Sequence, residues 1–240
     1  MKILELDIKK FFYNEDFEIE SLRGQSISID KGEKIAVIGP SGCGKSTLLK
    51  IISGLESRFD GSMEKNCKTA FVLQEYGLFP WKSVYKNIAL PLKLDKMDKN
   101  FIEKRVHEIA EMLGIEDIIR KYPANISGGQ KQRVAIGRAL ITEPELLLLD
   151  EPFNSLDSLT REDIQDMVLE IAEKRKMSLI MVTHNIEESV YMADKVLIMN
   201  KNGNNELMKI ERNGIEHRDF RNTELYYEQV AELRNRLKKI

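Results

Sequence analysis

KIAVIGPSGCGKST, residues 34–47, is the stretch of sequence that decides the fold. Residues 34–38 form a short run rich in β-branched residues, typical of a buried strand, and an apolar helix pattern follows Lys45. Residues 39–47 match G-x-x-x-x-G-K-[ST], in which glycines let backbone N–H groups curl around a phosphate while the helix N-terminus adds positive potential. The order strand, loop, helix therefore predicts a phosphate-binding loop and, with it, nucleotide binding.

Four short apolar runs along the chain, residues 35–38, 146–149, 179–182 and 196–199, carry no polar alternation. This pattern indicates strands buried on both faces, as in a parallel sheet covered by helices. We therefore predict an α/β fold, a P-loop NTPase core with a mostly parallel sheet. Near the N-terminus, Leu4, Leu6 and Ile8 alternate with polar residues, as do Ile27 and Ile29, which predicts an antiparallel β edge.

Residues 76–139 have a different pattern, because Ile102, Val106 and Ile109 recur at helical spacing and Gly114 is a helix-end signal. We predict an inserted α-helical subdomain here. Residues 223–240 place their apolar positions on one helical face, and residues 200–205 resemble a turn between strands. With 240 residues, the chain is expected to form a single domain, 1–240.

The composition argues against several classes of protein. A formal net charge of -2 gives no reason to expect nucleic acid as a partner. No apolar run reaches the roughly 20 residues of a membrane-spanning helix, and the first residues lack a signal-peptide pattern. Cys43 and Cys67 have neither metal-ligand spacing nor an adjacent base, so we predict no zinc site, disulfide or thiol chemistry.

Two adjacent side chains of the phosphate-binding loop have chemical roles. Lys45 would reach the β- and γ-phosphates of ATP, and the Ser46 hydroxyl would bind Mg²⁺. The other half of a magnesium site should be an acidic residue at the end of a neighbouring buried strand, and residues 146–149 lead into Asp150. The next residue, Glu151, could polarise a water that attacks the γ-phosphate. This pair predicts a hydrolase.

Two other segments favour the same chemistry. Ser127, Gly128, Gly129 and Gln130 precede a helix expected to begin near residue 131 and could form a second phosphate-binding helix terminus. Taken alone, the segment favours an N-cap and a turn, but beside residues 39–47 and the Asp150–Glu151 pair we favour phosphate binding. His184 follows the run 179–182, at a strand end where ligand-contacting residues of such sheets lie, and a neutral imidazole there could hydrogen-bond a γ-phosphate oxygen.

These residues resemble, in order, the motifs of the ATP-binding subunits of ABC transporters, over about residues 4–200. Residues 39–47 resemble Walker A, and Gln74 resembles the Q-loop. Residues 126–130 resemble the signature, with Ile126 in place of the usual Leu. Residues 146–150 resemble Walker B, Glu151 the catalytic base, residues 155–157 the D-loop and His184 the switch histidine.

The resemblance implies a role for each of these positions. Glu151, His184 and Gln74 would be catalytic, and Ser46, Gln74 and Asp150 would bind Mg²⁺. The residues that would contact ATP are Phe12, Gly39, Pro40, Ser41, Gly42, Cys43, Gly44, Lys45, Ser46, Thr47, Ser127, Gly128, Gly129, Gln130 and Asp157.

The adenine-stacking aromatic residue of this family falls among Phe11, Phe12 and Tyr13. The register favours Phe12, and its two neighbours remain open. Stacking on an aromatic face would select weakly among bases.

The family resemblance also implies partners. Two copies would bind two ATP molecules between them, each held by residues 39–47 of one copy and residues 127–129 of the other. ATP binding would close this homodimer and hydrolysis would reopen it. Permease subunits would hold the dimer at the cytoplasmic face of the membrane, and an extracytoplasmic solute-binding protein would complete the transporter.

Residues 78–81, LFPW, and the segments around residues 84–88 and 150–161 look most similar to importers of nitrate, sulfonates and taurine. Gln130, where many such chains have Met, and Asn185, where Asp is usual, depart from that pattern. The cargo therefore stays open.

Three alternatives remain beside an importer. An exporter of the macrolide or lipoprotein type uses ATPase chains of this length. A soluble ABC ATPase of the chromosome-structure type would need a long coiled coil between Lys45 and Ser127, where this chain has a short helical insertion, and translation-factor relatives carry two cassettes. A small-molecule kinase would have no use for residues 127–130.

Overall fold

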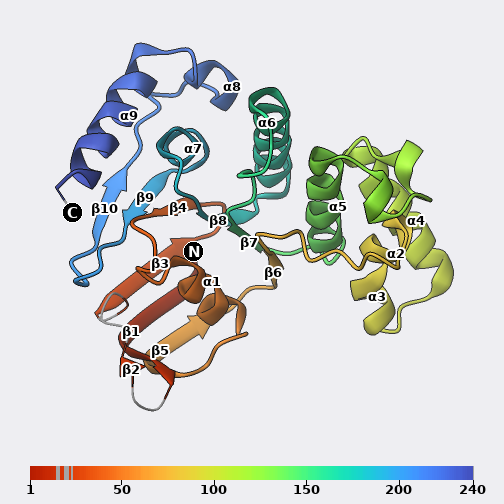
Figure 1. Cartoon of the computed structure of the whole chain (residues 1–240), viewed down its shortest axis with the longest axis horizontal. Helices are drawn as coiled ribbons and strands as arrows, with labels where there is room; N and C mark the ends of the chain where they lie inside the picture. The colour runs from red at the N-terminus through yellow and green to blue at the C-terminus, as the bar shows by residue number, and fades with distance from the viewer. Residues whose placement is uncertain (15–16, 19–21, 23, 240) are drawn as a thin grey trace.

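Figure 1 presents the computed structural model, which describes residues 1–14, 17–18, 22 and 24–239. A six-stranded sheet with strand order β10-β9-β4-β8-β7-β6 forms its centre. Neighbouring strands in this sheet are parallel, except that β10 is antiparallel to β9. The predicted mostly parallel sheet is thereby confirmed. The strands are β4 (Lys34–Ile38), β6 (Thr69–Val72), β7 (Leu146–Asp150), β8 (Ser178–Val182), β9 (Lys195–Ile198) and β10 (Glu206–Lys209).

The two faces of this sheet pack against different cores, as the unbroken apolar runs predict. In β7, Leu146 and Leu148 belong to one hydrophobic cluster, while Leu147 and Leu149 belong to the other. All four side chains are fully buried, because successive residues of a strand point to opposite faces and both faces are covered. The helices α6 (Ser158–Arg175) and α7 (Ile186–Met192) contribute to the second cluster.

The predicted N-terminal antiparallel strands are present, but they form a separate sheet and not an edge of the parallel one. In it, β1 (Lys2–Asn14) pairs with β2 (Phe17–Glu18), β3 (Gln25–Asp30) and β5 (Phe59–Lys65). The helix α1 (Lys45–Ser53) explains the separation: its Leu48 and Leu49 share a buried cluster with Leu6 of β1 and Val37 of β4. The apolar face of the second sheet therefore packs in one core with α1 and one face of the parallel sheet.

The predicted helical insertion lies to one side of the sheets, in yellow and green in Figure 1. Its first helix begins at Val84, and Tyr76 and Gly77 before it both have positive φ, which a helix cannot accommodate. Gly114, with φ +61°, follows the longest of these helices as expected. The elements are α2 (Val84–Ile88), α3 (Leu90–Leu94), α4 (Lys99–Met112), η2 (Glu116–Ile118), η3 (Pro123–Asn125) and α5 (Gly128–Leu140).

The C-terminal part of the chain contains α8 (His217–Phe220) and α9 (Glu224–Leu237). Tyr226, Val230 and Leu233 of α9 are buried, and α9 packs against α7, so its apolar face is part of the core as the sequence pattern indicates. In the part of the chain that the structure describes, no helix is both long and apolar enough to cross a membrane.

Candidate functional site

The phosphate-binding loop connects β4, between β8 and β9 in the sheet, to α1. Gly42 and Gly44 have φ of +80° and +92°, a region that side chains with a Cβ rarely adopt. At Gly39, an added Cβ would lie 2.3 Å from the Met199 carbonyl oxygen, so no other residue fits without movement of β9's end. The glycines predicted from the motif are therefore required by the local backbone.

Lys45 is buried under this loop, and its ammonium donates hydrogen bonds to the carbonyl oxygens of Gly39 and Pro40 over 2.9 and 3.0 Å. No side chain in the described part of the chain caps the N-terminus of α1, so its first N–H groups are free of side-chain acceptors from these residues. A lysine ammonium and an uncapped helix terminus at one loop make a site for an anion such as phosphate.

The side chain of Cys43 is fully buried in the core below the loop, and burial raises the pKa of its thiol. A neutral thiol is a poor nucleophile, which agrees with the interpretation that this residue has no thiol chemistry. Any contact of Cys43 with a nucleotide would come from its backbone N–H.

Ser46 and Asp150 meet where β7 ends beside the loop. The Ser46 hydroxyl donates a hydrogen bond to Asp150 Oδ1 over 3.0 Å, and burial raises the pKa of the Asp150 carboxyl. A cation would favour the ionised carboxylate. The described residues contain no group of three His, Cys, Asp or Glu side chains able to hold a metal. One hydroxyl and one carboxylate nevertheless fit Mg²⁺, which takes few protein ligands beside phosphate oxygens and water.

Three predicted catalytic residues converge at the ends of adjacent strands. Gln74 follows β6, Glu151 follows β7 and His184 follows β8. Gln74 Nε2 donates to Glu151 Oε2 over 3.1 Å, and His184 Nδ1 lies 3.7 Å from the same oxygen. Glu151 itself has φ +47°, a sparsely populated conformation for a residue with a side chain. The Glu151 carboxylate is thus the centre of a polar group at the carboxyl edge of the sheet.

Asn154 is a fourth member of this group that the sequence reasoning missed. Its amide donates to Glu151 Oε2 and lies 3.4 Å from His184 Nδ1. An amide three residues after a predicted base, in the same loop, is the signal that could have identified it. Asn154 holds the Glu151 carboxylate and the His184 ring in one arrangement.

The segment 127–130 caps α5 as a capping box. The Ser127 hydroxyl accepts from the Gln130 N–H over 3.2 Å, and the Gln130 side-chain oxygen accepts from the Ser127 N–H over 3.0 Å. This reciprocal capping starts α5 at Gly128 and not near residue 131. It also gives Gln130, an unusual residue at its position, a structural role. The Ser127 hydroxyl keeps its own proton for donation to another acceptor.

The two predicted halves of the ATP site are not brought together within one chain. Figure 1 places α5 in the helical insertion, apart from α1 and the phosphate-binding loop. Asp157 of the predicted D-loop is exposed and accepts from the Thr160 N–H over 3.0 Å, as the N-cap of α6. A nucleotide at the loop of residues 39–47 would need another chain to reach residues 127–129.

The structure excludes one of the three candidates for adenine stacking and does not decide between the other two. Phe11 is 1% exposed and belongs to the hydrophobic core, so its ring is not available to a base. The side chains of Phe12 and Tyr13 lie outside the described residues. The assignment to Phe12 therefore stays a prediction.

A cavity of about 530 Å³ opens beside the phosphate-binding loop. Pro40 and His184 line one part of it, and Leu237 at the end of α9 lines another. The exposed His184 ring thus borders open space next to the loop that would hold the phosphates.

Comparison with known families assigns this site. A model of the ABC transporter family matches residues 22–154. The chain belongs to the ABC transporter family. This ABC ATPase is an ATP-binding and ATP-hydrolysing subunit that energises a transporter. The matched segment includes the phosphate-binding loop, Ser127 to Gln130 and the Asp150–Glu151 pair.

Curated relatives of the ABC ATPase are similar over most of its length. It is 46% identical to the aliphatic sulfonates import ATP-binding protein SsuB of Bacillus subtilis (strain 168), over 80% of this chain and 77% of that protein. It is 39% identical to SsuB of Bacillus cereus (strain ZK / E33L), over 92% and 90% of the two chains. Among solved structures, the dimeric post-hydrolysis state of the ATP-binding cassette MJ0796 with ADP and Pi matches with a TM-score of 0.78 and 28% identity, over 87% and 99% of the chains.

Proposed function

We propose that two copies of this chain use Mg-ATP to drive the import of a small organic anion, an aliphatic sulfonate. The observation that carries the cargo class is the similarity to aliphatic sulfonate import proteins, up to 46% identity over most of the chain. The reaction itself, hydrolysis of ATP, belongs to the family. The other parts of the proposal concern how residues of this chain perform it.

In the proposed site, Lys45 exchanges its two carbonyl acceptors for phosphate oxygens, with which its charge interacts more strongly. Ser46 and Asp150 would hold Mg²⁺, with Gln74 as a further ligand or as a group that orients water. Bound there, the metal would supply positive charge that offsets the charge of the phosphates. Glu151 accepts the proton of the attacking water. Its partners Gln74 and Asn154 keep its carboxylate in place.

The dimer follows from the separation of the two ATP-contacting segments. Ser127, with a free hydroxyl proton at the N-terminus of α5, would donate to the γ-phosphate bound by the partner copy. Gly128 and Gly129 would bring that helix end close to the nucleotide. Loss of the γ-phosphate removes this acceptor, so hydrolysis weakens the closed dimer. The dimeric relative MJ0796 supports the pairing of two copies.

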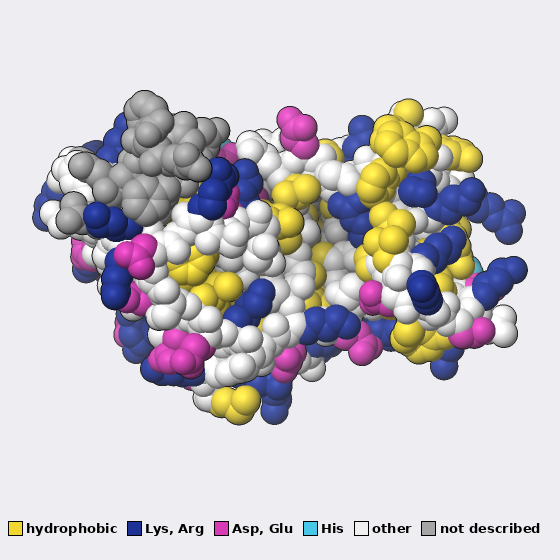
Figure 2. Space-filling view, turned by 90° about the horizontal axis from the view of Figure 1, so that it is seen from below, with side chains coloured by type: hydrophobic (Ala, Val, Ile, Leu, Met, Phe, Trp, Pro, Cys, Tyr) yellow, Lys and Arg dark blue, Asp and Glu magenta, His cyan; other side chains and the backbone are white. Residues whose placement is uncertain are grey.

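The helical insertion supplies the proposed surface for the permease. Its exposed large hydrophobic residues include Trp81, Leu94, Met97, Phe101 and Tyr122, with Trp81 70% exposed. In Figure 2 hydrophobic side chains gather at the end of the molecule that this insertion forms. Gln74 lies between this insertion and the Glu151 carboxylate, so nucleotide state would reach the permease through it. The chain would then act at the cytoplasmic face of the membrane, with a solute-binding protein outside.

The test of the cargo is uptake in the cell that makes this chain. The gene is deleted and replaced by a plasmid copy of either the wild-type chain or Glu151→Gln, and uptake of a radiolabelled alkanesulfonate is measured. We expect uptake to depend on the wild-type copy, while uptake of inorganic sulfate and of a polyamine is unchanged. Efflux of the sulfonate, or loss of polyamine uptake alone, would overturn the proposed function.

A further inference from the structure

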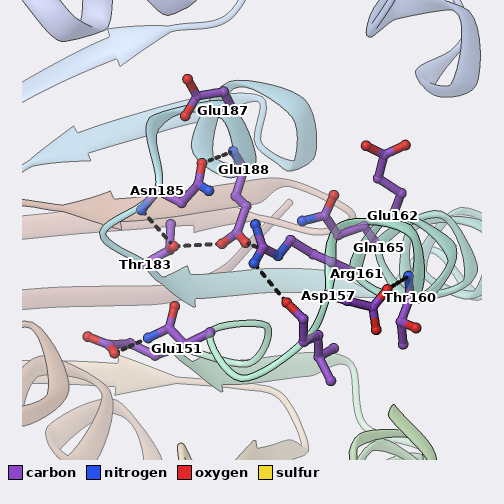
Figure 3. Close-up of polar contacts among 12 residues, drawn as sticks. Glu151, Asp157, Thr160, Arg161, Glu162, Gln165, Thr183, Asn185, Glu187 and Glu188 are labelled. Carbon is purple, nitrogen blue, oxygen red and sulfur yellow. Dashed lines mark hydrogen bonds and ion pairs between the residues drawn. The ribbon is translucent and has the colours of Figure 1, made fainter. Parts of the chain in front are cut away.

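A buried carboxylate and a guanidinium connect two loops of the catalytic site, and neither has a role assigned above. Glu188, in the first turn of α7, is 4% exposed, and Arg161 lies in the first turn of α6. Arg161 Nε is 3.5 Å from Glu188 Oε1. Figure 3 shows the two side chains pointing toward each other from their helices.

On the α7 side, Glu188 holds both neighbours of His184. The Thr183 hydroxyl donates to Glu188 Oε2 over 2.7 Å and accepts from the Asn185 N–H over 3.0 Å (Figure 3). The Asn185 side chain accepts from the Glu188 N–H over 3.0 Å as the cap of α7. The backbone that carries the exposed His184 ring is therefore anchored on one side by the Glu188 carboxylate, through Thr183, and on the other side by the Glu188 N–H, through the Asn185 side chain.

On the α6 side, Arg161 holds the loop of residues 155–157. Its Nη2 donates to the Leu156 carbonyl oxygen over 2.9 Å, and Asp157 caps the same helix through the Thr160 N–H (Figure 3). Asn154, which contacts both Glu151 and His184, comes two residues before Leu156. Fixing the Leu156 backbone thereby fixes the loop that presents Asn154.

A contribution to folding alone does not account well for this pair. Taking a carboxylate out of water costs several kcal/mol, which is roughly what its ion pair returns. Replacing a buried ion pair by apolar residues of similar size often leaves a protein equally stable. Burial raises the pKa of the Glu188 carboxyl, while Thr183 and Arg161 oppose that rise. Among the described residues Arg161 Nε has no hydrogen-bond acceptor, so the ion pair has room to shorten if the two loops move toward each other.

The geometry points to Arg161 and Glu188 as positioning residues for ATP hydrolysis, which set the loop of residues 155–157 against the loop that carries His184. This inference rests on the role proposed above for Glu151 and on the role predicted from the sequence for His184. Neither residue touches the nucleotide in this scheme. Each acts through a backbone that presents a group to the γ-phosphate or to the partner copy.

The test is a double-mutant cycle on the purified chain with Glu188→Gln, Arg161→Met and the double variant. Single-turnover hydrolysis of γ-labelled ATP with the chain in excess gives the rate, and a fluorescent ATP analogue gives the affinity. We expect each single variant to lose about tenfold in rate with unchanged affinity, and the double variant to lose no more than either single one. Equal losses follow because both residues act through one ion pair.

The matched control is Arg221→Met. Arg221 is similarly buried, pairs with Glu162 over 2.7 Å and hydrogen-bonds Gln165 over 2.8 Å, but contacts neither loop among the described residues. It should lower the thermal midpoint as much as Arg161→Met and leave the rate unchanged. Equal rate losses in the control, additive losses in the double variant, or a wild-type rate in folded Glu188→Gln would each overturn the inference.

Glu151→Gln and His184→Ala, run in the same assay, separate two kinds of failure. If both lose hydrolysis while Glu188→Gln and Arg161→Met keep it, only the positioning inference is wrong. If His184→Ala or Glu151→Gln keeps a wild-type rate, the proposed catalytic roles are wrong.

Discussion

Gln74 Nε2 donates a hydrogen bond to Glu151 Oε2 over 3.1 Å, between residues that lie 77 positions apart in the chain. The bond joins the end of β6, where the helical insertion begins, to the end of β7, where the proposed base lies. A movement of the insertion would therefore reach the Glu151 carboxylate through this bond, which links the proposed permease surface to the proposed base.

Glu151→Gln should retain ATP binding and lose hydrolysis. An amide fills the same space and still accepts the Gln74 hydrogen bond, but it takes no proton from water, and general bases contribute about 10²- to 10⁴-fold. Light scattering with ATP present should detect a dimer of the variant. The wild type should not accumulate this dimer, because it hydrolyses the ATP. Turnover near the wild-type rate would remove the assignment of Glu151 as the base.

Lys45→Ala should weaken ATP binding. The Lys45 ammonium is buried and hydrogen-bonded to two carbonyl oxygens. A hydrogen bond to a charged group contributes about 1.5–3 kcal/mol, which corresponds to about 10- to 100-fold in affinity. Titration with a fluorescent ATP analogue measures the change. Lys99→Ala, an exposed lysine of the helical insertion, is the control and should bind as the wild type does.

Much of this fold could be predicted because burial on both faces leaves a simple signal. The run of four leucines before Asp150 predicts a central strand, and the glycine pattern of residues 39–47 predicts the loop. That the N-terminal strands form a separate sheet could not be predicted, because their alternation gives one apolar face but not what that face packs against.

The side-chain contacts of the site could not be predicted from the sequence. Asn154, Arg161 and Glu188 lie in or near recognisable segments, yet polar residues on helix starts and loops are common and have no periodic pattern. Arg161 and Glu188 lie 27 residues apart in the chain, and the placement of α6 and α7 in the fold brings them together as an ion pair. Only the packed structure brings such residues within contact.

Gly129→Ala should destabilise the chain, whereas Gly128→Ala should not. A Cβ at Gly129 would lie 2.5 Å from Thr160 Cγ2, while at Gly128 the nearest atom is 3.6 Å away. Overpacking costs about 1–3 kcal/mol. Thermal melts should therefore separate the two variants, and adding Thr160→Ser, which removes the clashing methyl, should restore the Gly129→Ala midpoint. Gly128→Ala should instead weaken the ATP-dependent dimer of the Glu151→Gln protein.

His217 should make the chain less stable in mild acid. Burial, with the nearby Arg212 charge, lowers the pKa of its imidazole to about 4, below the 6.5 of an unperturbed histidine. His217 Nε2 lies 2.9 Å from Glu173 Oε1. Between pH 6.5 and about 4 the unfolded chain binds a proton that the folded one does not, so stability falls as pH falls through this window and is unaffected above it.

The measurement is the thermal midpoint of the wild type and of His217→Gln, which can donate to Glu173 but does not titrate. Other groups lose stability in acid too, and the difference between the two proteins isolates the histidine. We expect the two curves to run parallel above pH 6.5 and the wild type to fall more steeply below it. Parallel curves down to pH 4 would mean that the folded ring accepts a proton as readily as the unfolded one, with Glu173 compensating the charge.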